Sequence, residues 1–310
     1  MRTRTSLIVI FVLFLAFGGY SQTAKDHFEA GNRYYTVKDY SRAITSFTAA
    51  LGLVSTAPEI WFNRGQCYYF SGNYSSAIYD YSQAIKLRPR YTDAYFQRGL
   101  SRNKLGQHQA AVGDYTAAIG ISPADATIWY NRGIAYADLG SNDLAISDYS
   151  RAILLSPGYV KPYINRGAIY FKMKRYQDAL ADLDKALSLD STVAEAWGNR
   201  GVVRSTMGSQ DLAIADINQA IKLNPNHAKH YLDRGIAYYR KKQNALAIAD
   251  LSYAMTLDPN YYQALLVRAA IRFDAKAYAA ARADFEKVLE LKPGEETALR
   301  ALARLKAMGY

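Results

Sequence analysis

The sequence predicts an all-α protein, a solenoid of helix–turn–helix repeats that ends in a capping helix. Three observations lead to this fold class. A pattern of small and aromatic residues returns every 34 residues along most of the chain, without an insertion. The chain is 50% apolar and contains 27 tyrosines, enough to fill many helix-to-helix contacts. It has no alternating run of Val, Ile and Thr that would indicate strands.

The repeating pattern is clearest in residues 58–91. With Pro58 as position 1, large residues fall at positions 4, 11, 17 and 24, and small residues at positions 8, 20 and 27. The small residues are Gly65, Ala77 and Ala84. Because they let two helices approach closely while the large residues fill the space around them, the segment predicts a pair of packed helices. Pro89 then ends the second helix.

Eight such units follow one another in register. Position 8 is glycine in seven of them and Ala269 in the last, position 20 is alanine in all eight, and position 32 is proline in six. This pattern resembles the tetratricopeptide repeat. The resemblance implies a right-handed superhelical solenoid in which the first helix of each unit lines a concave groove. The predicted units are residues 24–57, 58–91, 92–125, 126–159, 160–193, 194–227, 228–261 and 262–295.

The two ends of the chain differ from the repeats. Residues 1–21 combine basic Arg2 and Arg4 with an apolar run over residues 7–17, which is shorter than the roughly 20 residues of a membrane span. They predict a cleaved signal peptide, with an uncleaved anchor as the alternative, and hence a periplasmic, envelope-associated or secreted protein. Residues 296–310 predict an amphipathic helix that caps the eighth unit.

Two charged positions vary together along the repeats. Position 7 is arginine and position 23 is aspartate in units two to eight, whereas unit one lacks both. Their joint absence predicts an ion pair between the two helices of one unit. Position 11 is also arginine in three units, at Arg102, Arg204 and Arg272. We expect those three units to be less stable, because they lack an aromatic contact.

The formal net charge of +11 invites a nucleic-acid or membrane-surface interpretation. The positions that face the groove in the resembling family carry six positive and seven negative residues, so the groove itself is nearly neutral. The excess basic residues fall on loops and second helices. We therefore expect no nucleic-acid partner, and a membrane partner only by surface association.

No pattern in the sequence indicates catalysis. There is no glycine-rich phosphate loop, and Cys67 is the single cysteine. His227 and His230 are close enough in sequence to hold a metal, but no third ligand accompanies them. We expect a protein that is not an enzyme and that has no metal site and no cofactor.

Amide side chains at position 6 form the most suggestive candidate site. The series is Asn63, Gln97, Asn131, Asn165, Asn199 and Asp233. It resembles the asparagine ladder of the repeat domain in O-linked N-acetylglucosamine transferases, and the resemblance implies that these side chains hold a peptide by its main chain. An alternative remains open, because Asn-Arg-Gly could be a local solution for this helix. A two-carboxylate clamp is disfavoured, since no unit has lysine at position 5.

Aromatic residues gather at the groove positions of the first units. The candidates are Phe62, Tyr69, Phe70, Phe96 and Tyr130. They could contact a ligand, or they could only pack neighbouring helices.

The function predicted from the sequence is a non-catalytic scaffold that binds protein or peptide segments in its groove. The alternative is a basic convex surface that docks on membrane lipid or an anionic polymer. A spacer without a ligand is the third possibility.

Overall fold

The computed structural model describes residues 21–310, and this part of the chain is entirely helical, with seventeen α-helices and no strand. The predicted all-α fold of paired helices is therefore confirmed. The signal peptide predicted for residues 1–21 lies outside the described residues except for Ser21. The side chain of Ser21 accepts a hydrogen bond from the backbone N–H of Ala24 and caps the first helix.

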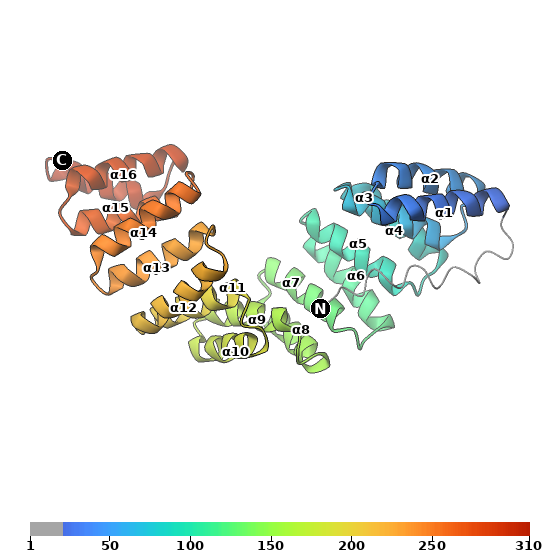
Figure 1. Cartoon of the computed structure of the whole chain (residues 1–310), viewed down its shortest axis with the longest axis horizontal. Helices are drawn as coiled ribbons and strands as arrows, with labels where there is room; N and C mark the ends of the chain where they lie inside the picture. Colours follow the sequence, from blue (N-terminus) through green and yellow to red (C-terminus); the bar gives the residue numbers. More distant parts are fainter. Residues whose placement is uncertain (1–20) are drawn as a thin grey trace. The chain divides into compact units, whose positions relative to one another are not determined.

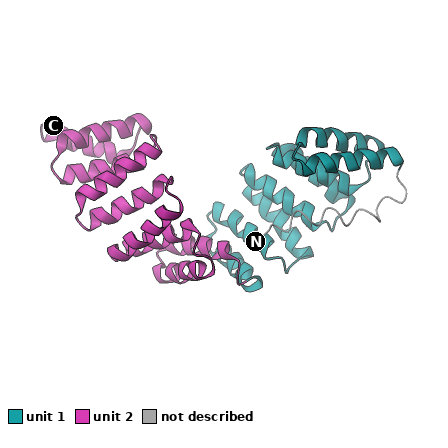
Figure 2. Ribbon diagram, viewed as in Figure 1, with its two compact units in different colours: residues 1–156 teal, residues 157–310 magenta. Residues whose placement is uncertain are grey.

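The chain divides into two compact units, residues 1–156 and 157–310 (Figure 2). The described part of the first unit consists of four antiparallel helix pairs (Figure 1). Its helices are α1 (Gln22–Thr36), α2 (Tyr40–Leu53), α3 (Pro58–Phe70), α4 (Tyr74–Leu87), α5 (Thr92–Lys104), α6 (His108–Ile121), α7 (Ala126–Asp138) and α8 (Asn142–Leu155).

The second unit contains four more pairs and a single final helix. Its helices are α9 (Val160–Lys172), α10 (Tyr176–Leu189), α11 (Ala194–Thr206), α12 (Gln210–Leu223), α13 (Ala228–Arg240), α14 (Asn244–Leu257), α15 (Tyr262–Asp274), α16 (Tyr278–Leu291) and α17 (Glu296–Ala307). Helix α17 packs on α16, and its Leu305 is fully buried in the apolar cluster of the last pair. This helix thus covers apolar surface that α15 and α16 would otherwise expose.

Small residues set the distance between the two helices of a pair. A Cβ atom added to Gly133 on α7 would lie 2.7 Å from a ring carbon of Tyr149 on α8, closer than packed side chains allow. The alanines at positions 20 and 27 that face this contact, Ala145 and Ala152, have no exposed surface. The pattern of small and large residues therefore works as the sequence predicted, with a ring seated directly over a glycine.

The predicted ion pair between helices is confirmed in all seven units that carry it. Each guanidinium donates through Nε and Nη2 to the two carboxylate oxygens of its aspartate, and the shortest N–O distances lie between 2.6 and 2.8 Å. The pairs are Arg64–Asp80, Arg98–Asp114, Arg132–Asp148, Arg166–Asp182, Arg200–Asp216, Arg234–Asp250 and Arg268–Asp284. Every one of these aspartates is buried, so the two-point geometry matters for stability.

Six of these arginines also reach the preceding helix pair, which the sequence did not reveal. Arg132 donates through Nη1 to the hydroxyl of Thr116 on α6 at 3.0 Å, and its guanidinium lies 4.8 Å from the ring centre of Trp129. Equivalent Nη1 bonds join Arg64, Arg98, Arg200, Arg234 and Arg268 to Thr48, Ser82, Asp184, Asn218 and Ser252. One side chain thus fixes three helices relative to one another.

Arginine at position 11 replaces the missing ring with a second ion pair. Arg102 donates to Asp114 at 2.8 Å, in addition to the bonds from Arg98. Arg204 and Arg272 do the same in their units. We expected these units to be the weaker ones, but the structure gives each of them a carboxylate held by two guanidinium groups.

Candidate functional site

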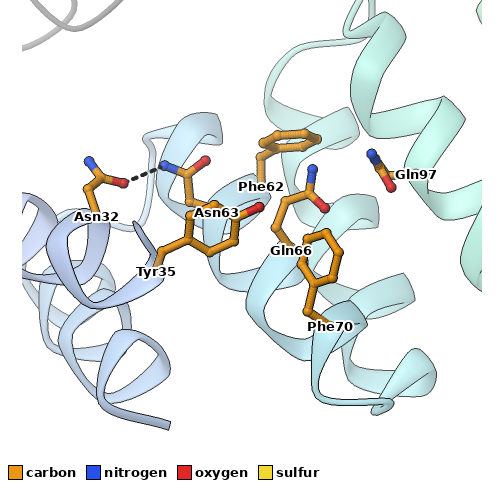
Figure 3. Close-up of a pocket in the computed structure, with 7 residues that line it drawn as sticks. All are labelled: Asn32, Tyr35, Phe62, Asn63, Gln66, Phe70 and Gln97. Atoms are coloured by element: carbon orange, nitrogen blue, oxygen red, sulfur yellow. Dashed lines mark hydrogen bonds between the residues drawn. The ribbon is translucent and has the colours of Figure 1, made fainter. Parts of the chain in front are cut away.

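A pocket of about 100 Å³ lies on the first helices of the first unit (Figure 3). It is formed by three neighbouring first helices, in which α1 contacts α3 and α3 contacts α5. Its lining residues are Asn32, Tyr35, Phe62, Asn63, Gln66, Phe70 and Gln97. All seven side chains are neutral, so the pocket combines rings with amides and carries no formal charge.

The rings of the pocket belong to a larger aromatic cluster that holds them in place. Phe70 is 51% exposed, although its ring stacks on Tyr40 with centroids 5.6 Å apart and planes 16° apart. Tyr35 and Tyr69 contact the same ring at 6.1 and 5.5 Å. Phe70 is therefore an exposed apolar surface on a rigid support, which is the arrangement of an anchor point for a ligand.

Phe62 lies deeper in the same pocket. It is 8% exposed and packs against Tyr81 and Tyr91, with ring centroids 5.6 and 5.0 Å apart. Burial raises the pKa of the Tyr81 hydroxyl and of the Tyr91 hydroxyl, so both phenols stay neutral. Phe62 thus forms the apolar floor of the pocket, and the two phenols that it packs against carry no charge.

Hydrogen bonds orient the amides of the pocket. Asn63 donates through Nδ2 to Oδ1 of Asn32 at 3.1 Å (Figure 3), and the Tyr81 hydroxyl donates to Oε1 of Gln66 at 3.1 Å. An amide has two donor hydrogens and one acceptor oxygen. These two bonds therefore direct the Asn63 oxygen to accept, and the NH₂ groups of Asn32 and Gln66 to donate, toward a molecule in the pocket.

The structure brings four of the eleven predicted site residues together in this pocket, namely Phe62, Asn63, Phe70 and Gln97. The other predicted aromatic residues support the helices around it. Tyr69 packs against Phe70 and Tyr74, and burial raises the pKa of its hydroxyl.

Phe96 and Tyr130 both pack on the second helix of their own pair. The Phe96 ring lies 5.9 Å from that of Tyr115, and Tyr130, 9% exposed, lies 5.8 Å from Tyr149. Both rings occupy position 5, as Phe62 does, but neither of them lines the pocket, which matches the packing alternative for these two rings.

The remaining position-6 side chains have individual surroundings. Asn131 donates its Nδ2 to the carbonyl of Thr127, one turn back on its own helix, at 2.8 Å. In the second unit, Asn165 on α9 and Asn199 on α11 are half-buried. On α13, Asp233 accepts a 2.7 Å bond from Lys229, and burial raises the pKa of its carboxyl.

Sequence reasoning missed Asn32 and Gln66 as site residues. Both occupy position 9 of their unit, one helical turn after position 6. Position 9 is an amide in the first two units only. Leu100 and Ile134 stand at the same position in the next two units. A change from apolar to amide at a groove-facing position was the signal available in the sequence.

The histidines and the cysteine do not form a reactive site in the described part of the chain. His230 is 5% exposed, lies 4.4 Å from the His227 ring, and its pKa is lowered to about 4, chiefly by burial. Burial raises the pKa of the Cys67 thiol to about 12, which keeps it protonated. Across residues 21–310, no three His, Cys, Asp or Glu side chains cluster as metal ligands would. Nor does any helix of these residues have the length and apolar character that crossing a membrane requires.

Across residues 21–310, eight successive helix pairs and one final helix define a helical-repeat protein. Family models described as tetratricopeptide repeat match residues 58–91, 126–159, 160–193, 194–227 and 232–296, and a TPR repeat model matches residues 99–140. These matches together cover more than half of the chain. The chain belongs to the tetratricopeptide repeat family. Members of this family generally mediate protein–protein interactions and are typically non-catalytic.

Solved structures share the fold at low sequence identity. A tetratricopeptide repeat protein from Parabacteroides merdae is 22% identical with a TM-score of 0.67, and the match covers 80% of this chain and 98% of that one. A chain of the APC/C hetero-tetramer Cut9–Hcn1 is 19% identical with a TM-score of 0.66, covering 86% of this chain and 52% of that one. PilF from Pseudomonas aeruginosa is 20% identical with a TM-score of 0.59, covering 70% and 97%. No curated protein gives a significant match.

Proposed function

We propose that this protein is a non-catalytic scaffold that binds an extended segment of a partner protein along its first helices. In the first unit, the segment lies across α1, α3 and α5. The observation that carries the proposal is the pocket there, where an exposed ring on a rigid aromatic support adjoins amides whose free donors and acceptors match a peptide group.

Selection from a random-sequence peptide library, displayed on phage, tests this proposal without a known partner. The full mature chain is the target, and the affinity of a recovered peptide is measured by fluorescence anisotropy. Changing Asn63 and Gln97 together to alanine removes two amides from the pocket. Each neutral hydrogen bond contributes about 0.5–1.5 kcal/mol, so the double variant is expected to bind about 10-fold more weakly.

Gln109→Ala is the matched control, because Gln109 is an exposed amide on the second helix α6. This change is expected to leave peptide affinity unchanged. If the library yields no peptide, or if the double variant and the control bind equally well, the first helices are not the binding surface.

We also propose that the chain is exported and processed. The basic start and the eleven-residue apolar run of residues 7–17 support this. When the full sequence is expressed in a bacterial host, intact-mass measurement is expected to give a protein that begins near Gln22. A protein that retains residues 1–21 would contradict cleavage and leave the anchor alternative.

Three lysines support a second candidate, docking of a basic surface on anionic lipid. Lys174, Lys242 and Lys276 are exposed and occupy the turn between the two helices of their pairs, with φ of about 60°. Gly140 and Gly208 take the same turn position in other pairs, so in this chain lysine stands at a position where it costs backbone strain.

Co-sedimentation with phosphatidylglycerol vesicles distinguishes this candidate from groove binding. Docking is expected to be lost between about 50 and 500 mM salt, because the Debye length, beyond which salt screens charges, falls from about 10 Å at 0.1 M to about 3 Å at 1 M. Changing the three lysines to glycine preserves the turn and removes the charge, so it should abolish docking. Equal binding of the variant, or binding that salt does not weaken, would eliminate this candidate.

A further inference from the structure

We propose that the pocket between α1, α3 and α5 selects an apolar, non-aromatic side chain of four non-hydrogen atoms, that of leucine, isoleucine or methionine, at one fixed place in the bound segment, and rejects a charged side chain there. This inference rests on the proposed function, because it assigns the residue specificity of the same groove.

The size of the pocket limits its occupant. An engineered apolar cavity of 150 Å³ holds benzene, whereas this pocket measures about 100 Å³. A branched or unbranched aliphatic side chain fits within this volume, whereas part of a phenylalanine or tryptophan ring would extend out of the pocket into solvent. An alanine side chain would leave most of the pocket unfilled and would forgo the contacts with the rings.

The walls of the pocket favour an apolar occupant. Phe62 and Phe70 present ring surface from α3, and Tyr35 presents a third ring from α1 (Figure 3). Phe70 is half exposed while one face of its ring stacks on Tyr40. An aliphatic side chain that covers this ring removes apolar surface from water on both partners, and no rearrangement of the protein is needed first.

The neutral lining rejects charge. A lysine or aspartate side chain that enters the pocket loses its water and meets no opposite charge, since the seven lining residues are uncharged. The amides cannot replace the lost solvation fully, because Asn63 and Gln66 each already use part of their hydrogen-bonding capacity within the protein.

The amides fix the place of the selected side chain along the segment. The Asn63 oxygen can accept a main-chain N–H, and the NH₂ group of Gln66 can donate to a main-chain carbonyl. Both side chains come from α3, as do the two phenylalanine rings. When Asn63 and Gln66 bind the main chain of the segment, one side chain of that segment therefore lies over Phe62 and Phe70.

Peptides recovered from the random library test the specificity. They are expected to share one aliphatic position amid variable neighbours. In a recovered peptide with blocked ends, changing that residue to alanine should weaken binding about 10-fold, and changing it to lysine or aspartate at least 100-fold.

Two pocket variants should change the preference as well as the affinity. Phe70→Ala enlarges the pocket, so the peptide carrying phenylalanine should gain affinity relative to the leucine peptide. Gln97→Glu introduces a carboxylate with nearly the same shape, so the ratio of leucine to lysine affinity should fall at least 10-fold. Gln109→Glu adds the same charge on α6, outside the pocket, and should leave the ratio unchanged. Circular dichroism and thermal melting verify that each variant is folded.

The possible outcomes separate this inference from the proposed function. If peptides bind through Asn63 and Gln97 but share no aliphatic position, or if Gln97→Glu and Gln109→Glu act alike, the selectivity inference is wrong and the scaffold function stands. If no peptide binds, both fail. If chito-oligosaccharide binds and peptides do not, the rings and amides recognise a sugar, and both are overturned.

Discussion

Removing the guanidinium of Arg132 tests the ion pair that joins the two helices of a unit. Arg132 holds both oxygens of Asp148, with N–O distances of 2.7 and 2.8 Å, and Asp148 is 3% exposed. The chain provides a matched comparison in the preceding pair, where Asp114 is equally buried at 3% but accepts from both Arg98 and Arg102. Arg132→Ala leaves a buried carboxylate without its guanidinium, whereas Arg98→Ala leaves Asp114 with its second partner.

The difference between the two variants can be worked out from these contacts. Breaking a buried ion pair by removing one partner costs about 3–5 kcal/mol, so Arg132→Ala should lose that much. Both changes remove hydrogen bonds to a charged group, so those losses largely cancel in the comparison. Only Arg132→Ala also leaves a buried carboxylate without any partner, because Arg102 remains 2.8 Å from Asp114 in Arg98→Ala, and an unsatisfied buried group costs about 1–3 kcal/mol. We expect Arg98→Ala to cost about 2 kcal/mol less than Arg132→Ala.

Native-state hydrogen exchange is the suitable assay. Repeat chains open locally, and exchange measures the opening free energy of each helix separately. Protection of the amides of α7 and α8 in Arg132→Ala should fall further than protection of α5 and α6 in Arg98→Ala. In addition, Asp148→Ala and the Arg132→Ala, Asp148→Ala double variant complete a cycle, in which the double variant should lose less than the sum of the single losses.

Two results would refute this reasoning. Equal losses in the two pairs would mean that Arg102 does not stabilise Asp114 in solution. Strict additivity in the cycle would mean that Arg132 and Asp148 do not interact.

Three further predictions concern single positions. The pKa of His230 is lowered to about 4, so His230 binds a proton in the unfolded chain before it does in the folded one as the pH falls below 6.5. The free energy of unfolding should therefore fall by about 2 kcal/mol between pH 6.5 and 4, and urea melts of His230→Ala should show a weaker pH dependence. The φ of 60° at Lys174 strains an L-residue by about 1–2 kcal/mol, so Lys174→Gly should raise the melting temperature. Gly140→Ala should lower it for the same reason, and an unchanged melting temperature in both variants would refute the backbone strain at this turn position. The buried hydroxyl of Tyr115 has no hydrogen-bond partner, so Tyr115→Phe should leave the stability unchanged or raise it. Tyr81→Phe loses the hydrogen bond to Gln66 on α3 and should cost about 1 kcal/mol, so equal losses in calorimetry would contradict this reasoning.

Much of the candidate site was accessible from the sequence as positions, but not as a pocket. The series of amides and the aromatic residues of the first units included Phe62, Asn63, Phe70 and Gln97, and the structure brings these four together. The sequence could not separate these from Tyr130, because the same repeat position can face a groove or a neighbouring ring. In this chain the ring of Tyr149 occupies the space beside Tyr130. Only the packed helices show which side of each residue is covered.

The sequence by itself determined the fold class and the ion pairs between helices. Both follow from local periodicity: a 34-residue repeat places the same side chains at the same helix contact in every unit, so joint presence or absence of Arg and Asp reveals a contact 16 residues apart.

Only the tertiary structure decided the contacts that no joint variation of two repeat positions reveals. The third bond of Arg132 to Thr116, the second guanidinium at Asp114, and the Asn32–Asn63 bond that orients the pocket amides all join residues from different helices. The first and the last of these reach into a neighbouring pair. No periodicity within one unit encodes the angle and spacing between pairs, and those two quantities fix which donors and acceptors remain directed at a ligand.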